Sequence, residues 1–129
     1  MKKDLKKIYG APNCPVRNVL DRIGDKWSIL VILLLGENDT LRFGELDKLI
    51  ETISQKMLTV TLKTLEADGL IERKSFGSVP PKVEYSLTTL GKSIIPPVTL
   101  LAYWAESNMP EILASREKYA TNSTEGTYR

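Results

Sequence analysis

Residues 53–87 read ISQKMLTVTLKTLEADGLIERKSFGSVPPKVEYSL, and this stretch is the most informative part of the sequence. Its first part predicts a helix, because Leu58, Leu62 and Leu65 repeat at the i, i+4, i+7 spacing of one helical face. Ser54 is the expected N-cap and Gly69 the expected left-handed C-cap. Two short strands, 70–74 and 83–87, should follow, because a loop with one glycine and two prolines separates two extended segments. The stretch therefore predicts a helix followed by a β-hairpin.

The segments before this stretch predict three more helices and a short extended piece. Pro15 can open the first helix and Asp25 can cap the second, which is apolar on all sides and should be buried. An extended piece at 40–43 precedes a shorter helix that runs to about Ile50. About four residues link it to the helix at 54, as in a helix-turn-helix. The fold class is therefore mainly α with a small β-wing, a winged helix-turn-helix domain.

The C-terminal third predicts extra helices that this small core does not need. Thr88 can cap one helix, the pair at 96–97 should kink or restart it, and Pro110 should begin a last short helix to about Tyr119. These apolar helices either fold back on their own core or form a two-fold dimer interface, which we favour. The dimerisation candidates come from the first helix and from this region: Val16, Val19, Leu20, Val98, Leu101, Tyr103 and Trp104.

The expected domains are a basic N-terminal arm at 1–12, the winged helix-turn-helix at 13–92, dimerisation helices at 93–120 and a polar tail at 121–129. The formal net charge of the 129 residues is only +2, and residues 51–92 hold six cations against five acids. Any case for DNA binding therefore depends on where the cations lie. Lys56 and Lys63 lie on a helix face with no carboxylate before Glu66.

The loop of the hairpin has a composition that suits contact with phosphate or with the minor groove of DNA. Lys74 and Lys82 bracket it, and Ser75 and Ser78 lie within it. The alternatives to DNA contact are that the helix face is simply solvated and that the hairpin is an ordinary surface hairpin.

Several classes of function are disfavoured by composition. The chain has no histidine and one cysteine, so a common general base and the usual zinc ligands are missing. We therefore expect no enzyme activity, no metal and no cofactor. The longest apolar run, 29–35, is too short to span a bilayer, and no secretory signal is visible. These features and the cysteine count predict a cytoplasmic protein without a membrane partner.

The chain resembles the HxlR family of MarR-like bacterial transcription regulators. The similar blocks are CPVRNVLDRIGDKW (14–27), LRFGEL (41–46), ISQKMLTVTLKTLEADGLIER (53–73), VPPKVEYSLTTLG (79–91) and MPEILASREKY (109–119). The resemblance implies a homodimer on double-stranded DNA, with the recognition helix in the major groove and the wing in the minor groove. Two departures are the pair at 51–52, where the family often has Pro-Gly, and the doubled proline at 96–97.

Carried onto this chain, the resemblance assigns the DNA-facing start of the recognition helix to Ser54, Gln55, Lys56 and Thr59. Gln55 and Thr59 are candidate base readers, whereas Lys56 and Lys63 suit phosphate or guanine. Arg42 and Lys82 match basic positions of the family and are candidate phosphate contacts.

Cys14 is a second kind of candidate site. Some members of the family use a cysteine at this position to sense quinones, electrophiles or oxidants, through an intersubunit disulfide or an adduct. A helix N-terminus favours the thiolate, and Arg17 is close in sequence. The alternative is a small buried packing residue.

The predicted function is a dimeric, sequence-specific DNA-binding regulator, with a repressor favoured. The alternative is a winged helix used for protein–protein interaction without specific DNA binding.

Overall fold

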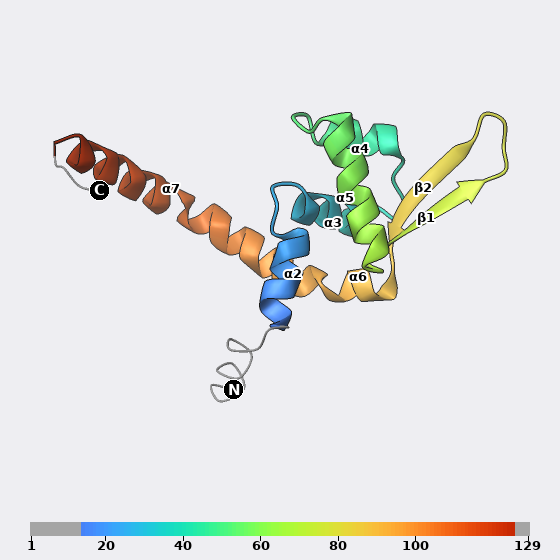
Figure 1. Cartoon of the computed structure of the whole chain (residues 1–129), viewed down its shortest axis with the longest axis horizontal. Helices are drawn as coiled ribbons and strands as arrows, with labels where there is room; N and C mark the ends of the chain where they lie inside the picture. Colours follow the sequence, from blue (N-terminus) through green and yellow to red (C-terminus); the bar gives the residue numbers. More distant parts are fainter. Residues whose placement is uncertain (1–13, 126–129) are drawn as a thin grey trace. The chain divides into compact units, whose positions relative to one another are not determined.

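The computed structural model describes residues 14–125, with side chains to residue 122. These residues form two compact units that divide between Ile95 and Pro96. The predicted basic arm at 1–12 and the last residues of the predicted tail lie outside the described part of the chain. The first unit contains four helices, a two-stranded hairpin and a short helix, and the second is a single long helix (Figure 1).

The four helices of the first unit lie close to where the sequence predicts them. They are α2 (Pro15–Ile23), α3 (Ser28–Glu37), α4 (Phe43–Leu49) and α5 (Gln55–Ala67). Asp25 does not take the N-cap position of α3, which Trp27 occupies, but it caps the start of the helix from two residues earlier: its Oδ1 accepts the backbone N–H groups of Trp27 and Ser28, both at 2.7 Å. The prediction that α3 is buried on all sides is wrong in one respect: Leu30 is exposed, whereas Val31, Ile32 and Leu35 are buried.

The core of this unit forms around α5. Leu58, Leu62 and Leu65 are buried, as their spacing predicts, and they share the core with residues of α3, α4 and β1: Val31, Ile32, Leu46 and Ile71. The turn between α4 and α5 closes when the N–H of Ile53 donates to the carbonyl of Ile50 at 3.2 Å, and both side chains are buried. Buried anchors on both sides of the turn fix the direction in which α5 leaves it.

The hairpin consists of β1 (Ile71–Phe76) and β2 (Lys82–Leu87), which pair in antiparallel fashion from Ile71↔Leu87 to Phe76↔Lys82. It extends away from the helices (Figure 1). The strands reach further than predicted, so Phe76 and Lys82 form the last pair of the ladder and do not belong to the loop. Leu41 adds an isolated bridge to Tyr85, with hydrogen bonds of 3.0 and 2.8 Å in both directions.

The short helix α6 (Thr89–Ser93) packs tightly against the start of the hairpin. Thr88 caps it as predicted, since its Oγ1 accepts the N–H of Gly91 at 3.0 Å, and the same hydroxyl donates to the carbonyl of Gly69 at 2.6 Å. Gly69 has a φ of 76°, the left-handed conformation predicted for it. A methyl group on Gly91 would collide with the carbonyl oxygen of Leu70, so this position needs glycine.

The C-terminal region confirms that a new helix starts beside the proline pair at 96–97 and corrects the prediction of a separate last helix from Pro110. Residues Ile95–Glu125 form one helix, α7, of 31 residues, which contains Pro110 and continues into the predicted tail. The pair at 96–97 lies in the first turn, where backbone N–H groups have no partner within the helix, so proline costs little there. Pro110 removes one hydrogen bond without ending the helix.

Candidate nucleic-acid interface

The start of α5 presents the residues predicted to face DNA. The Ser54 hydroxyl accepts the N–H of Met57 at 3.0 Å, which confirms it as the N-cap. Gln55 and Lys56 are exposed in the first turn. The Thr59 hydroxyl is half-buried and donates to the carbonyl of Gln55 at 2.9 Å, so it keeps only acceptor capacity for a ligand in this rotamer.

Two apolar residues of α5 are exposed among these polar ones. Met57 and Val60 have exposed fractions of 37% and 47%, although a helix usually turns such side chains inward. Val60 lies one turn after Lys56 and one turn before Lys63 or Thr64, away from the buried leucine face. Apolar side chains at such positions can contact the methyl group of thymine. The exposure of Val60 could have been predicted from the sequence, since Val60 falls outside the leucine repeat that marks the buried face.

Arg42 lies at the entrance to α4. Its backbone N–H donates to the Glu45 carboxylate at 2.8 Å, which fixes the chain at the N-cap, and its side chain is exposed. Arg42 therefore remains a candidate phosphate contact beside the helix-turn-helix.

One face of the hairpin carries a cluster of cations around an aromatic ring. The register places Lys74 opposite Glu84 and Phe76 opposite Lys82 on the same face. The ammonium groups of Lys74 and Lys82 lie 5.6 and 5.2 Å from the Phe76 ring centroid, within cation–π range. Lys82 also lies 3.4 Å from the Glu84 carboxylate. Both lysines are therefore held along the strands.

The other face of the hairpin turns toward α5. Ile71, Arg73 and Ser75 share this face with Tyr85. A cavity of about 420 Å³ separates the two elements and is lined by Phe43, Thr59, Leu62, Lys63, Glu66, Arg73 and Tyr85. Arg73 and Lys63 thus bring two cations to the groove between α5 and the hairpin. Arg73 was not predicted as a site residue, because assigning its face requires the register of the strands.

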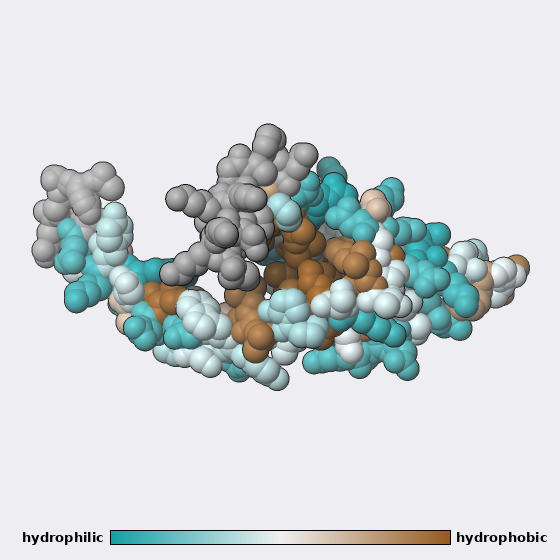
Figure 2. Space-filling model, turned by 90° about the horizontal axis from the view of Figure 1, so that it is seen from below, coloured by the Kyte–Doolittle hydropathy of each residue, from teal (hydrophilic) through white to brown (hydrophobic). Residues whose placement is uncertain are grey.

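The end of the hairpin differs from the predicted polar tip. The Ser78 hydroxyl donates to the carbonyl of Pro80 at 2.8 Å, so it serves the loop itself. Val79 is 97% exposed at this end. In Figure 2 hydrophilic surface covers the part of the hairpin nearer the helices, and apolar or intermediate surface covers its outer end. The predicted cations thus lie behind an apolar tip.

The predicted dimerisation residues lie on two helices. Val16, Val19 and Leu20 are exposed on α2. On α7, Leu101, Tyr103 and Trp104 are exposed, whereas Val98 is buried, with 5% of its surface exposed, and so is not available to a partner subunit in this structure. Each helix therefore has large apolar side chains in contact with solvent.

Cys14 occupies the N-cap position of α2 and is buried, with 5% of its surface exposed. Its carbonyl accepts the N–H of Asn18 at 2.9 Å. The packing interpretation of this residue agrees with its burial, and a reactive role would require the thiol to become accessible.

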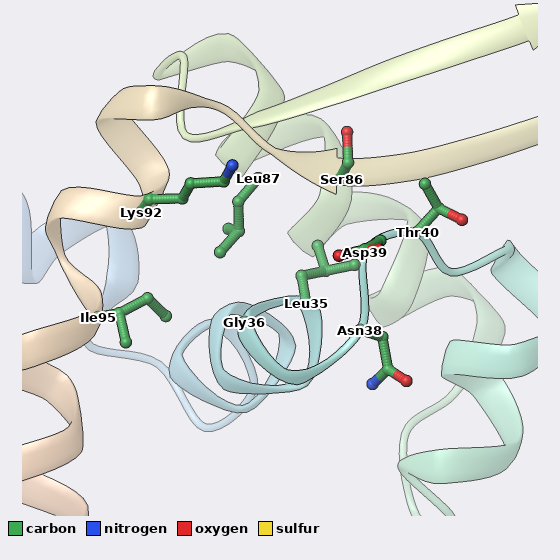
Figure 3. A pocket seen from close by; sticks show the side chains of 9 residues that line it. All are labelled: Leu35, Gly36, Asn38, Asp39, Thr40, Ser86, Leu87, Lys92 and Ile95. Carbon is green, nitrogen blue, oxygen red and sulfur yellow. The ribbon is translucent and has the colours of Figure 1, made fainter.

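A separate cavity of about 560 Å³ opens where the end of α3 meets β2 and α6 (Figure 3). Its walls combine apolar residues with residues of both charges: Leu35, Gly36, Asn38, Asp39, Thr40, Ser86, Leu87, Lys92 and Ile95. Figure 3 shows the Lys92 side chain extending across it toward β2. None of the residues predicted to contact DNA lines this cavity, so it is distinct from the candidate interface.

Among the described residues, no group of three or more His, Cys, Asp or Glu side chains could hold a metal ion. Within the same part of the chain, none of the helices has the length and apolar character needed to cross a membrane.

The helix-turn-helix, the hairpin and the cations on both define a transcriptional regulator with a winged helix-turn-helix DNA-binding fold. The model of the HxlR-like helix-turn-helix family matches residues 22–113. The chain belongs to the HxlR family, as its resemblance in sequence implied.

Individual relatives agree with this assignment. The chain is 44% identical over 110 residues to YtfH of Escherichia coli, an uncharacterized HTH-type transcriptional regulator, with 85% of this chain and 86% of that protein covered. The solved structure of the transcriptional regulator ytfH from Salmonella typhimurium superposes with a TM-score of 0.74 at 43% identity, covering 83% of this chain and 95% of that one. The solved structure of the redox regulator HypR in its reduced form superposes with a TM-score of 0.72 at 42% identity. The match covers 78% of this chain and 98% of that one.

Proposed function

We propose that this protein is a homodimeric, cytoplasmic repressor that binds a specific DNA sequence. In this proposal α5 enters the major groove and the hairpin reaches the adjacent minor groove. Gln55 and Thr59 read bases, and Arg42, Lys56 and Lys63 contact phosphate or guanine. The observation that carries the proposal is the exposed, carboxylate-free first half of α5 beside a hairpin that carries Lys74 and Lys82.

The charges of this surface support DNA as the partner. Lys63 and Arg73 line the groove between α5 and the hairpin, and Glu66 is the one carboxylate in that lining. A phosphate backbone passing this groove would meet cations from both elements, which fixes the register of α5 on the bases. Ser75 lies exposed on the same face of the hairpin and can donate a further hydrogen bond.

The test is a titration of the full chain against DNA from upstream of its own gene, measured by fluorescence anisotropy at several salt concentrations. Specific binding should weaken with salt on a log–log plot whose slope reports several phosphate contacts. A scrambled duplex of the same composition is the control. Equal affinity for both duplexes would reject sequence-specific binding and favour a protein-interaction role. Placing the operator before a reporter then tests repression, since an activator would raise expression.

A second copy of the chain is the proposed partner for the exposed apolar side chains of α2 and α7. Soluble monomers rarely leave large apolar patches uncovered, and winged-helix regulators usually read paired half-sites with a two-fold dimer. Sedimentation should give a mass of twice 14.5 kDa. Trp104→Asp should shift the equilibrium toward monomer, whereas Lys118→Ala, a change at a polar position of α7, should not. A monomeric parent protein at micromolar concentration would reject the dimer.

Oxidant or electrophile sensing through Cys14 is the proposed regulation. Structures of the redox regulator HypR in oxidized and reduced forms are among the most similar ones, at 43% and 42% identity. Because Cys14 is buried, we expect slow reaction with a thiol reagent in the folded protein. Diamide should join the Cys14 thiols of the two proposed subunits in a disulfide while being reduced to its hydrazine, which should lower the operator affinity of the parent and leave Cys14→Ser unchanged. The same response in both proteins would reject Cys14 as the sensor.

A further inference from the structure

The end of the hairpin combines features that an ordinary charged wing would not have. Val79 is 97% exposed, which is unusual for a β-branched apolar residue. It is followed by two prolines, and prolines have no backbone N–H to donate. The Ser78 hydroxyl is already donated to the carbonyl of Pro80 at 2.8 Å. The tip therefore offers an apolar surface with few hydrogen-bond donors.

The cations of the hairpin are held away from this tip. Lys74 and Lys82 both place their ammonium groups over the Phe76 ring, at 5.6 and 5.2 Å from its centroid. Lys82 is drawn further along the strand by Glu84, 3.4 Å away. Since Phe76 and Lys82 are the last pair of the ladder, both charges stay where the strands end. The loop beyond them carries no charged residue.

We infer that the hairpin reads the minor groove through an apolar contact of Val79, flanked by two phosphate contacts from Lys74 and Lys82. This inference rests on the proposed function and names the DNA feature that the hairpin selects. Minor-groove binders commonly insert apolar side chains, and the groove is only about 6 Å wide. Because both lysines lie beside Phe76, where the strands end, they can contact phosphates while the tip enters the groove.

The selected feature is a minor groove without the exocyclic amino group of guanine. That amino group is the one minor-groove substituent that separates G·C from A·T pairs. It fills the floor of the groove and needs a hydrogen-bond acceptor, which an isopropyl group cannot supply. Val79 thus favours A·T pairs under the hairpin by exclusion, without a hydrogen bond to any base.

The test uses a duplex selected by the parent protein from a random DNA library. Each adenine outside the major-groove half-site is replaced in turn by 2,6-diaminopurine, which adds the minor-groove amino group. For the parent, affinity should fall at the one or two positions under the hairpin. Val79→Ala should bind the unmodified duplex about tenfold more weakly, the equivalent of losing part of a buried valine contact. It should also lose most of the discrimination against diaminopurine.

Matched variants separate the apolar contact from the charges. Val79→Ile keeps an apolar, β-branched tip and should retain both affinity and discrimination. Val79→Ala should leave the salt slope unchanged, whereas Lys74→Ala should reduce it by about one without altering the diaminopurine pattern. If no duplex is selected from the library, the proposed function itself fails. If the parent selects a duplex but Val79→Ala binds and discriminates like the parent, the apolar contact alone is overturned.

Discussion

The cap of α3 provides a stability prediction whose size follows from three hydrogen bonds. Asp25 Oδ1 accepts two backbone N–H groups at 2.7 Å, and Oδ2 accepts the Ser28 hydroxyl at 2.6 Å. Ser28 is completely buried. Asp25→Ala removes the cap, worth about 0.5–2 kcal/mol, and leaves a buried hydroxyl unsatisfied, which costs about 1–3 kcal/mol. We expect the free energy of unfolding to fall by about 1.5–5 kcal/mol in total.

Urea unfolding followed by far-UV circular dichroism, at one fixed protein concentration, measures this loss. The double variant Asp25→Ala/Ser28→Ala is the informative comparison, because it removes the orphaned hydroxyl together with its partner. It should be destabilised by less than the sum of the two single changes. A loss below about 0.5 kcal/mol for Asp25→Ala, the range of ordinary surface changes, would refute this reasoning.

The same carboxylate has a predictable pH dependence. Partial burial pushes its pKa up, but hydrogen bonds from the Ser28 hydroxyl and from backbone N–H groups outweigh burial and hold the pKa below its ordinary value. Because the pKa of this carboxyl group is lower in the folded state than in the unfolded state, its ionised form stabilises the fold at every pH above the unfolded-state pKa. That stabilisation is lost as the pH falls through the folded-state pKa. The stability difference between the parent and Asp25→Ala should therefore be constant near neutrality and shrink below about pH 4.

Four further changes test the interface and its support. Gln55→Ala should relax base preference at one position by about 1–3 kcal/mol in a competition titration, with other positions unaffected. Lys82→Ala should weaken binding to all sequences and reduce the salt slope by about one. Gly91→Ala should lower the free energy of unfolding by about 1–3 kcal/mol, because its methyl group meets a backbone carbonyl; a wild-type value would contradict the packing. Arg22→Lys keeps the charge but loses the paired contact with Asp68, so operator affinity should fall while the urea midpoint stays unchanged.

Local signals explain why the helix-turn-helix could be predicted from sequence. Ser54 caps the next residues of its own helix, and Gly69 takes a left-handed conformation that few other residues adopt. The leucines of α5 face the core because helical geometry puts their spacing on one side. Each of these features depends on neighbours within a few residues, so the sequence alone contains the information.

The parts that the sequence did not predict depend on longer-range geometry. The sequence around Pro110 predicts the start of a helix. In the structure α7 continues past this residue, because the residues on both sides favour a helix. Phe76 and Lys82 read as loop residues, and only the pairing register shows that they are opposite one another in the ladder. The same register is required to assign Arg73 to a face of the hairpin. Only then can its position in the groove beside Lys63 be inferred.

The Arg22–Asp68 pair connects α2 to the end of α5 and sets an orientation. Arg22 donates from Nε and Nη2 to the two carboxylate oxygens of Asp68, at 3.0 and 2.9 Å. Both side chains are substantially exposed, so the pair contributes little to the free energy of folding. A two-pronged contact nevertheless restricts the angle between the helices more than a single charge would. Cys14 lies at the N-cap of α2 and exposed apolar residues lie along it, so the proposed thiol regulation and dimerisation both predict a change at this contact, which Arg22→Lys tests.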